Sequence, residues 1–194
     1  MSLRSPEIIL ASRSPRRRQL LEQAGYEFVV CPPHDSAESE ADRPEPPAEL
    51  VARLARQKAE DVVGRTDEGL VLGCDTVVEC RGSILGKPED VQHARSMLQM
   101  LRGSEHQVYS GVCLWHVPSD HRVVRVAVTS LLMSPISDEQ VEAYLRTGDW
   151  EGKAGAFGYQ DGHDWLQILD GSESNVVGLP LELLAEMIRE FQTS

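Results

Sequence analysis

The fold is decided near the N-terminus, where residues 8–25 read IILASRSPRRRQLLEQAG. The apolar run 8–10 predicts a short strand. Ser14 is a favourable N-cap, and Pro15 suits the first helical position because its missing N–H would have no partner there. Leucines at helical spacing follow, and Gly25 ends the run. The chain is therefore expected to run from a strand through a tight turn into a helix.

The N-terminus of this helix is a candidate anion site, because free N–H groups and the positive end of the helix dipole meet there. The polar side chains around it are Ser12, Ser14, Arg13, Arg16, Arg17 and Arg18. Cations at this end oppose the dipole, so a negative ligand should offset the cost, and phosphate is the obvious one. Arg13 and Arg18 taken singly fit a solvated basic patch, whereas the whole cluster favours anion binding.

The composition is that of a globular protein, and its charge argues against one class of ligand. The chain has 194 residues, 41% apolar and 26% charged, which suits one large globular domain or two small lobes. Its net charge of -12 argues against binding a nucleic-acid polymer, which would require a basic face. Yet four of its 19 Lys and Arg residues fall within positions 13–18. Such concentration indicates a small, highly charged ligand.

The cysteines and the apolar segments indicate in which cellular compartment the protein is expected and whether it is expected to associate with a membrane. Cys31, Cys74, Cys80 and Cys113 form no CxxC pair and no zinc-like spacing. We expect reduced, mostly buried thiols in a cytoplasmic protein. No signal peptide is recognisable, and no apolar stretch approaches the roughly 20 residues that span a membrane. No membrane partner is expected.

A proline-rich acidic loop over residues 32–47 precedes a predicted helix over residues 47–64. The apolar stripe of that helix is assigned to Val51, Leu54 and Val62. Lys58 lies four residues from two of them and therefore on the stripe. Its ammonium group either extends to the edge of the helix or reaches an anionic site.

Asp75 is the strongest single candidate. Residues 69–80 form a nearly continuous apolar strand typical of a central position in a sheet, and Asp75 and Thr76 lie in its middle. A carboxylate there is costly unless it is paired, hydrogen-bonded or bound to metal. This pattern favours a functional role.

The remaining elements alternate between strand and helix. After the strand over 69–80, the patterns predict a turn over 81–83 from which residues 84–85 return as a hairpin, and a fixed loop Gly86-Lys87-Pro88. They then predict a helix over 89–101, a long hairpin over 106–133, a helix capped by Ser137, a glycine-rich binding loop over 148–162, a strand over 165–169, a polar loop over 171–178 and a helix over 179–191. This alternation indicates an α/β fold with a mixed sheet. The polar clusters fall at strand ends, where such sheets bind ligands.

Several motifs occur together in a characteristic order. They are A-S-R-S-P-R-R at 11–17, QKA at 57–59, G-C-D-T-V-V at 73–78, G-K-P at 86–88, K-A-G-A-F-G-Y-Q at 153–160 and V-V-G-L-P-L at 176–181. This set resembles the Maf family of nucleoside triphosphate pyrophosphatases, also labelled septum formation inhibitors. The match covers nearly the whole chain.

The resemblance implies one domain over residues 1–194, with a twisted mixed sheet flanked by helices and two lobes around a central cleft, related to the inosine triphosphatase-like fold. The implied reaction converts a nucleoside triphosphate and water to the monophosphate and pyrophosphate. It implies a divalent metal cation, Mg²⁺ or Mn²⁺. Members of the family are often dimers, so a homodimer is expected.

The resemblance also assigns residues. It implies Asp75 as the catalytic carboxylate and Glu38 as a second acidic residue, with Glu40 as a possible substitute. The phosphate-contacting positions are Ser12, Arg16, Arg17, Lys58 and Lys87, and Ser14 joins them from the same loop. Two departures stand out: Cys74 replaces a usual Ala, and residues 161–164 replace a more glycine-rich continuation at the expected rim of the pocket.

The chemistry fits these residues. Hydrolysis at an α-phosphate requires a positioned water, neutralisation of the polyphosphate and a metal. Mg²⁺ commonly uses one or two carboxylates together with substrate phosphates, so Asp75 with Glu38 would suffice. The sequence leaves open whether Asp75 is the base, a metal ligand or both.

Three positions bear on the substrate. Arg16, Thr76 and Gln160 match the branch of the resembled family that acts on dTTP and UTP, whereas the branch for 7-methyl-GTP has Trp, Gln and Glu there. A neutral amide can donate to and accept from the edge of uracil or thymine, whereas a carboxylate suits the cationic 7-methylguanine. We therefore predict dTTP and UTP as preferred substrates, with CTP weaker.

Three alternatives remain at this stage: a 7-methyl-GTP pyrophosphatase, a nucleotide-binding regulator of cell division without catalysis, and an α/β protein with a phosphate loop for another ligand. Asp75 discriminates against a pure polyanion binder, because a buried carboxylate facing phosphates is unfavourable without a metal.

Overall fold

The computed structural model describes residues 7–39, 44–161 and 163–193 and shows the predicted α/β architecture. Its seven-stranded sheet has the order β2-β1-β3-β5-β6-β7, with β4 paired to β3. The strands are β1 (Ile8–Ala11), β2 (Phe28–Val30), β3 (Leu70–Cys80), β4 (Ser83–Leu85), β5 (Glu105–His116), β6 (His121–Met133) and β7 (Leu166–Asp170). The helices are α1 (Pro15–Gln23), α2 (Pro47–Val63), α3 (Val91–Leu101), α4 (Asp138–Thr147), α5 (Glu173–Val177) and α6 (Leu181–Thr193).

The first strand and helix form as the opening motif predicts. Ser14 is the N-cap of α1, and its Oγ accepts a hydrogen bond from the Arg17 backbone N–H at 3.5 Å. Pro15 is the first helical residue, and Gly25 adopts a positive φ just after the helix. The turn between β1 and α1 is therefore fixed by local chemistry.

The pairing of the sheet leaves an opening at the middle of β3. On one side of β3, parallel β1 pairs only as far as Ala11↔Gly73, and antiparallel β4 begins only at Val78↔Leu85. In the described sheet, residues 74–77 therefore have no strand beside them on that side, whereas β5 pairs along β3 on the other. Asp75 and Thr76 lie at this opening, where β1 ends and the chain turns into α1.

Helix α2 packs on the sheet at very short range because two strand positions are glycine. A Cβ added at Gly73 would lie 2.2 Å from the Ala55 carbonyl oxygen, and one at Gly111 would lie 2.1 Å from that of Val51. The buried face of α2 comprises Val51, Ala55, Ala59 and Val62. The predicted stripe was wrong at Leu54, which is only partly buried, because small alanines permit the close approach.

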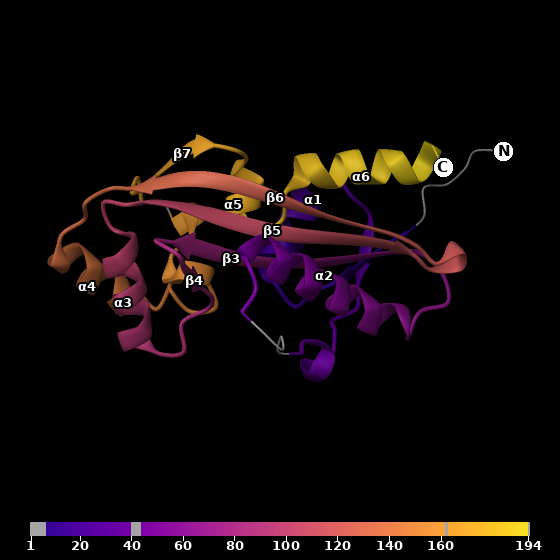
Figure 1. Cartoon of the computed structure of the whole chain (residues 1–194), viewed down its shortest axis with the longest axis horizontal. Coiled ribbons are helices and arrows are strands. Elements are labelled where there is room, and N and C mark those ends of the chain that lie inside the picture. The colour runs from indigo at the N-terminus through magenta and orange to yellow at the C-terminus, as the bar shows by residue number, and fades with distance from the viewer. Residues whose placement is uncertain (1–6, 40–43, 162, 194) are drawn as a thin grey trace.

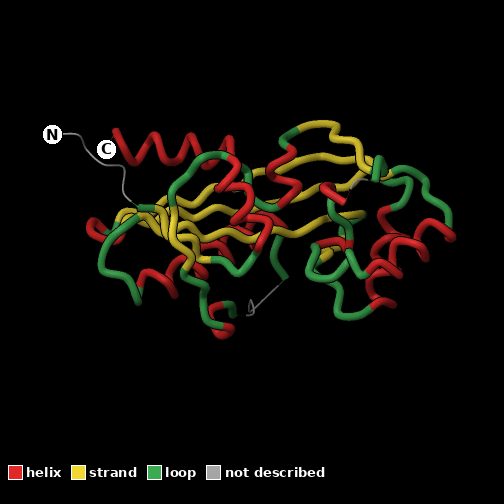
Figure 2. The backbone as a smooth tube through the Cα atoms, turned by 180° about the vertical axis from the view of Figure 1, so that it is seen from behind, coloured by secondary structure: helices red, strands yellow, loops and turns green. Residues whose placement is uncertain are grey.

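The hydrophobic core is divided between the two ends of the sheet. At one end α1 and α6 pack on one face of β1 and β3 and α2 packs on the opposite face, and at the other end α3, α4 and β4 enclose a separate core. The long strands β5 and β6 run through both ends (Figures 1 and 2). The expected two lobes are present, and the opening in β3 lies between them.

Two other sequence-based expectations have clear outcomes. The predicted polar loop over residues 171–178 was wrong, because Ser172 caps the short helix α5 with a bond from the Asn175 N–H. All four cysteines are free thiols, and three of them are buried. Among the described residues, no helix combines the length and apolar character needed to cross a lipid bilayer.

Candidate functional site

A cavity of about 400 Å³ opens at the gap in β3, between the two cores. One end is charged and is lined by the turn before α1, by Lys58 and by Asp75. The other end is mainly apolar and runs under the glycine-rich loop; its lining residues are Val78, Leu101, Val108, Leu131, Met133 and Phe157, with the buried His106 beside Leu131. The sequence-predicted residues that line the cavity are Ser12, Ser14, Arg16, Arg17, Glu38, Lys58, Asp75, Thr76, Lys87 and Gln160.

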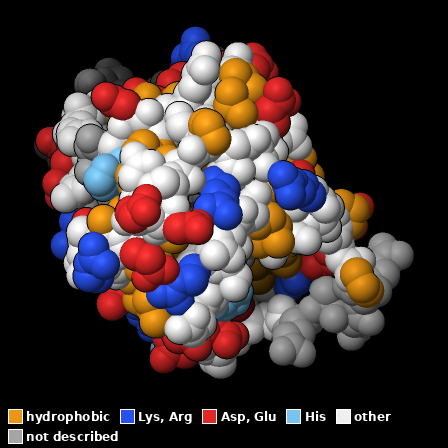
Figure 3. All heavy atoms as spheres, turned by 90° about the vertical axis from the view of Figure 1, so that its left-hand side faces the viewer, with side chains coloured by type: hydrophobic (Ala, Val, Ile, Leu, Met, Phe, Trp, Pro, Cys, Tyr) orange, Lys and Arg blue, Asp and Glu red, His pale blue; other side chains and the backbone are white. Residues whose placement is uncertain are grey.

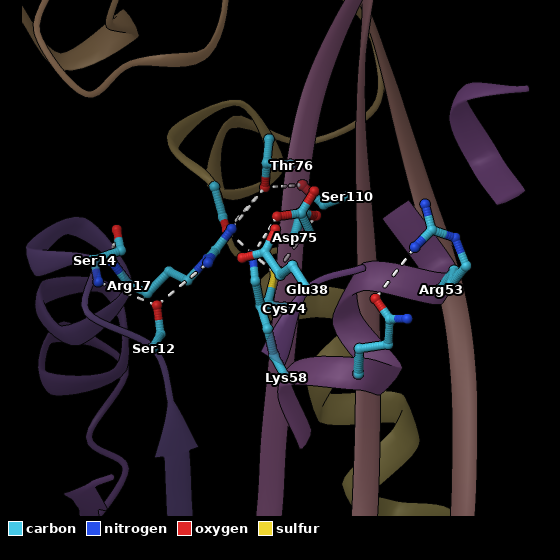
Figure 4. A network of polar contacts seen from close by, with 12 residues as sticks. Ser12, Ser14, Arg17, Glu38, Arg53, Lys58, Cys74, Asp75, Thr76 and Ser110 are labelled. Atoms are coloured by element: carbon cyan, nitrogen blue, oxygen red, sulfur yellow. Dashed lines mark hydrogen bonds and ion pairs between the residues drawn. The ribbon is translucent and has the colours of Figure 1, made fainter. Parts of the chain in front are cut away.

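Lys58 lies between two carboxylates at the charged end. Its Nζ is 2.5 Å from Asp75 Oδ1 and 3.0 Å from Glu38 Oε1. The side chains of Lys58 and Asp75 are only 12% and 13% exposed, whereas that of Glu38 is 46% exposed. Asp75 thus has the partner that its burial requires. Lys58 reaches an anionic site instead of merely extending to the edge of its helix (Figure 4).

Arg17 joins three parts of the chain on the other side of the gap. Its Nε donates to Gly178 O at 2.8 Å, Nη1 to Ser12 Oγ at 3.3 Å and Nη2 to Thr76 Oγ1 at 3.1 Å. Thr76 also exchanges a 2.8 Å hydrogen bond with Ser110 (Figure 4). Each terminal nitrogen of Arg17 has a second N–H besides the one used in these bonds. Arg17 can therefore connect Gly178, Ser12 and Thr76 and also donate to a phosphate.

The other arginines of the cluster differ in position. Arg16 Nη2 donates to Gly152 O at 2.8 Å and so connects α1 with the glycine-rich loop of the other lobe. Arg13 forms an exposed ion pair with Asp35, which contributes little stability in water. Arg18 is exposed and is not among the described residues that line this cavity. The sequence suggested a solvated patch for Arg13 and Arg18 taken singly; this agrees with the position of Arg18, whereas Arg13 lines the cavity.

Lys87 projects from the Gly-Lys-Pro loop and is exposed to the cavity. Surrounding protein atoms and the nearby cations Lys58 and Arg17 lower the pKa of Lys87 below the ordinary lysine value. A polyanion bound there would reverse that shift. Gln160 lies at the exposed rim of the same cavity.

The comparison with known families agrees with this arrangement. The sequence model of the Maf-like protein family matches residues 7–191. The chain belongs to the Maf family. A "dTTP/UTP pyrophosphatase" of Rhodopirellula baltica is 55% identical over 97% of this chain and 84% of its own length. A protein of the same name from Salinibacter ruber is 43% identical over 94% and 89%.

Solved structures show a more distant likeness. A HAM1 protein from Coxiella burnetii is similar over 95% of this Maf chain and 99% of that chain, with 14% identity and a TM-score of 0.47. A dITP/XTP pyrophosphatase from Mycobacterium abscessus matches 96% and 97% with 13% identity and a TM-score of 0.44.

Among the residues whose side chains the structure describes, neither departure from the Maf pattern lines the cavity, so the expected place of residues 161–164 at its rim was wrong for His163 and Asp164. Cys74 is buried, and its Sγ is 3.4 Å from Gly178 O, the carbonyl that Arg17 also contacts. Burial raises the pKa of the Cys74 thiol, which keeps it neutral. In the second departure, His163 stacks on Trp165 with ring centroids 4.3 Å apart. Gly162 lies outside the described residues, as does Glu40, the alternative to Glu38.

Asp75 and Glu38 are acidic side chains that line the charged end of the cavity and could hold a divalent metal. Among the described residues, no group of three or more His, Cys, Asp or Glu side chains converges on one point. Asp75 and Glu38 nevertheless direct oxygens at the same ammonium nitrogen, so both can reach one cation. Two carboxylates fit Mg²⁺ or Mn²⁺, which completes its coordination with water and phosphate oxygens.

Sequence reasoning missed several residues that shape this site. Ser110 holds Thr76, and Gly73 and Gly111 admit α2 close enough for Lys58 to reach Asp75. The apolar end was also missed, because the patterns over 89–101 and 106–133 predicted only a helix and a hairpin and gave no sign of a cavity between them. The sequence signal that pointed to this end was the glycine-rich loop. The structure explains one of its glycines: Gly155 has φ +68°, and a Cβ there would lie 3.0 Å from Val78 Cγ2.

Proposed function

We propose that the protein is a nucleoside triphosphate pyrophosphatase that hydrolyses dTTP and UTP to the nucleoside monophosphate and pyrophosphate. One observation carries the proposal. A lysine and two carboxylates meet at the open edge of β3, directly opposite a helix N-terminus with basic side chains. Carboxylates for a metal and cations for phosphates are the groups that phosphoryl transfer requires. The names of the curated relatives support the same activity.

The two ends of the cavity give the substrate an orientation. The triphosphate occupies the charged end, near Ser12, Arg17, Lys58 and Lys87. The sugar and base extend toward the apolar end, where Val78, Val108 and Phe157 offer apolar contact that excludes water. A nucleotide has a similar division, because its triphosphate is charged and the faces of its base are apolar, whereas the edge of the base carries donors and acceptors.

Asp75 and Glu38 hold the divalent cation in this scheme, and the cation supplies charge neutralisation and polarises the water when bound. Water attacks the α-phosphorus, and the bond to the oxygen bridging the α- and β-phosphorus breaks. The carboxylate of Asp75 serves as metal ligand, as acceptor of the water proton, or as both, and each role requires its ionised form. Lys58, Lys87 and Arg17 stabilise the charge that develops on departing pyrophosphate.

Substrate choice is assigned to Arg16, Thr76 and Gln160. Gln160 at the rim presents a neutral amide, which can accept from the N3–H of uracil or thymine and donate to a neighbouring carbonyl oxygen. Thr76 is held by Arg17 and Ser110, so its side chain has a fixed direction. Arg16 spans the cavity mouth to Gly152. CTP reverses the donor and acceptor pattern and should be a weaker substrate.

Assembly and location are further parts of the proposal. The protein is proposed to act as a homodimer in the cytoplasm, where its four free thiols stay reduced. Sedimentation at micromolar concentration tests the dimer. A single 21.5 kDa species would contradict it.

The decisive experiment is a panel of dTTP, UTP, CTP, GTP and 7-methyl-GTP with Mg²⁺, scored for pyrophosphate against orthophosphate. Pyrophosphate from dTTP and UTP is the expected result. Orthophosphate would place the attack at the γ-phosphate and contradict the proposal. A preference for 7-methyl-GTP would favour the sister activity, and binding without turnover would favour a regulator.

A further inference from the structure

Glu38 differs from Asp75 in how it is held. Asp75 lies inside a strand that pairs with β5, whereas Glu38 follows a short 3-10 helix (Asp35–Ala37) in a surface loop. Its side chain is 46% exposed, and Lys58 is the partner shown for it. A loop carboxylate of this kind loses conformational entropy when it is ordered, so something must fix the backbone that carries it.

The next residue, Ser39, is held by helix α2 at three atoms. Its backbone N–H donates to Gln57 Oε1 at 3.3 Å, and its carbonyl accepts from Arg53 Nη1 at 2.7 Å. Its Oγ accepts from Gln57 Nε2 at 2.6 Å. Both polar backbone groups and the side chain of Ser39 are therefore bound.

Arg53 organises this clamp. Its Nη1 also donates to Gln57 Oε1 at 3.2 Å, which fixes the direction of the Gln57 amide. Its Nε and Nη2 form a bidentate pair with Glu45 at 2.7–3.0 Å. The planar guanidinium suits this task because it can satisfy the carboxylate, the amide and the carbonyl at once, which a lysine cannot.

The clamp and the site lysine belong to the same helix. Arg53 and Gln57 are four residues apart and lie on one ridge of α2, and Lys58 directly follows Gln57. Figure 4 shows Arg53 beside the site, away from the group formed by Asp75, Glu38 and Lys58. Among the described residues that line the cavity, neither Arg53 nor Gln57 is present.

We infer that Arg53 and Gln57 are positioning residues that hold Glu38 against Lys58 and Asp75 by gripping Ser39. This inference rests on the proposed function for its kinetic consequence, because an oriented Glu38 matters to a reaction that uses it. Groups that orient a metal-binding carboxylate commonly affect activity by about 10- to 100-fold.

The kinetic test is a double-mutant cycle with UTP and Mg²⁺. Arg53→Met and Gln57→Met are each measured in the wild type and in Glu38→Gln. If they act through Glu38, each lowers kcat by about 10-fold in the wild type and less than about twofold in Glu38→Gln. Arg53→Lys retains the charge without the planar fork and should recover only part of the loss. Equal losses in both backgrounds would overturn the inference.

Arg56→Met is the matched control, because Arg56 is an exposed arginine on the same helix outside the clamp. It should leave kcat unchanged. A loss equal to that of Arg53→Met would point to a general effect of charge on α2 and would also overturn the inference. Thermal unfolding of each variant checks that the fold is retained.

A second measurement is independent of turnover. Amide hydrogen exchange of a peptide covering residues 34–39 should accelerate in Arg53→Met and in Gln57→Met but not in Arg56→Met. Unchanged exchange would show that the clamp does not hold the loop. If wild-type protein hydrolyses no nucleotide, the proposed function fails while this measurement still decides the clamp.

Discussion

The two ends of the cavity are built in different ways. At the charged end, ion pairs and hydrogen bonds within the protein fix the side chains, as in the contacts of Lys58 with Asp75 and Glu38. At the apolar end, Val78, Val108 and Phe157 belong to a hydrophobic core and are fixed by packing. A directional network can distinguish a transition state from a ground state, whereas a packed apolar wall binds both equally.

This difference has a kinetic meaning. Changes at the charged end should reduce kcat, because charge develops there during the reaction. Changes at the apolar end should raise KM and leave kcat nearly unchanged. Figure 3 shows acidic and basic side chains interspersed over the end of the molecule that carries α3 and α4.

The largest effect is expected for Asp75→Asn, which keeps the shape of the side chain but removes its charge. We expect kcat to fall on the order of 10² or more, because both a metal ligand and a proton acceptor are lost. Steady-state kinetics with UTP measures this. Glu79→Gln, on the same strand but outside the cavity lining, should behave like wild type. Near-normal turnover by folded Asp75→Asn would remove Asp75 from the mechanism.

Lys87→Met should lower kcat by about 10- to 100-fold, since its charge stabilises the leaving pyrophosphate. The same change should raise the melting temperature at neutral pH. The pKa of Lys87 is lower in the folded protein than in the unfolded chain. At a pH below this lowered pKa, the charged lysine therefore destabilises the folded state relative to the unfolded state, and methionine removes this destabilisation. Calorimetry and kinetics on one sample measure both effects. A destabilised but active variant would contradict both.

The lowered pKa of Lys87 also has a pH consequence in the wild type. The side chain loses its proton at a lower pH than a free lysine does, so kcat/KM should fall on the alkaline side, below the ordinary lysine pKa. Lys87→Arg should move that decline to higher pH. A decline that does not move would assign it to another group.

Gln160→Glu changes a neutral amide to a carboxylate at the rim of the cavity. We expect kcat/KM for UTP relative to 7-methyl-GTP to fall by about 10-fold, because a carboxylate faces carbonyl oxygens in uracil but favours a cationic base. The measurement is competition between the two nucleotides. An unchanged ratio would show that Gln160 does not read the base.

The smallest effect on chemistry is expected for Val78→Ala at the apolar end. Removing two methyl groups should raise KM a few-fold with kcat nearly unchanged, and should cost about 1–3 kcal/mol of stability. Chemical denaturation and steady-state kinetics measure the two quantities. A fall in kcat similar to that of Lys87→Met would abolish the distinction between the ends.

The sequence by itself determined those features that depend on local chemistry. The turn from β1 into α1 follows from Ser14 and Pro15, whose capping and backbone preferences act within a few residues. The apolar run around Asp75 predicted a central strand, and burial then required a partner for the carboxylate. The order of the motifs was enough to identify the Maf family.

Only the tertiary structure decided which residues meet. Lys58 and Asp75 are 17 positions apart, and Arg17 and Gly178 are 161 apart. The close packing of α2 on Gly73 and Gly111, and the short helix α5 in place of a predicted loop, bring these atoms together. Periodicity reports which face of an element is apolar, but it carries no information about the partner that the face will meet. The clamp of Arg53 on Ser39 is likewise a long-range contact between a helix and a loop, so it became visible only when the chain was folded.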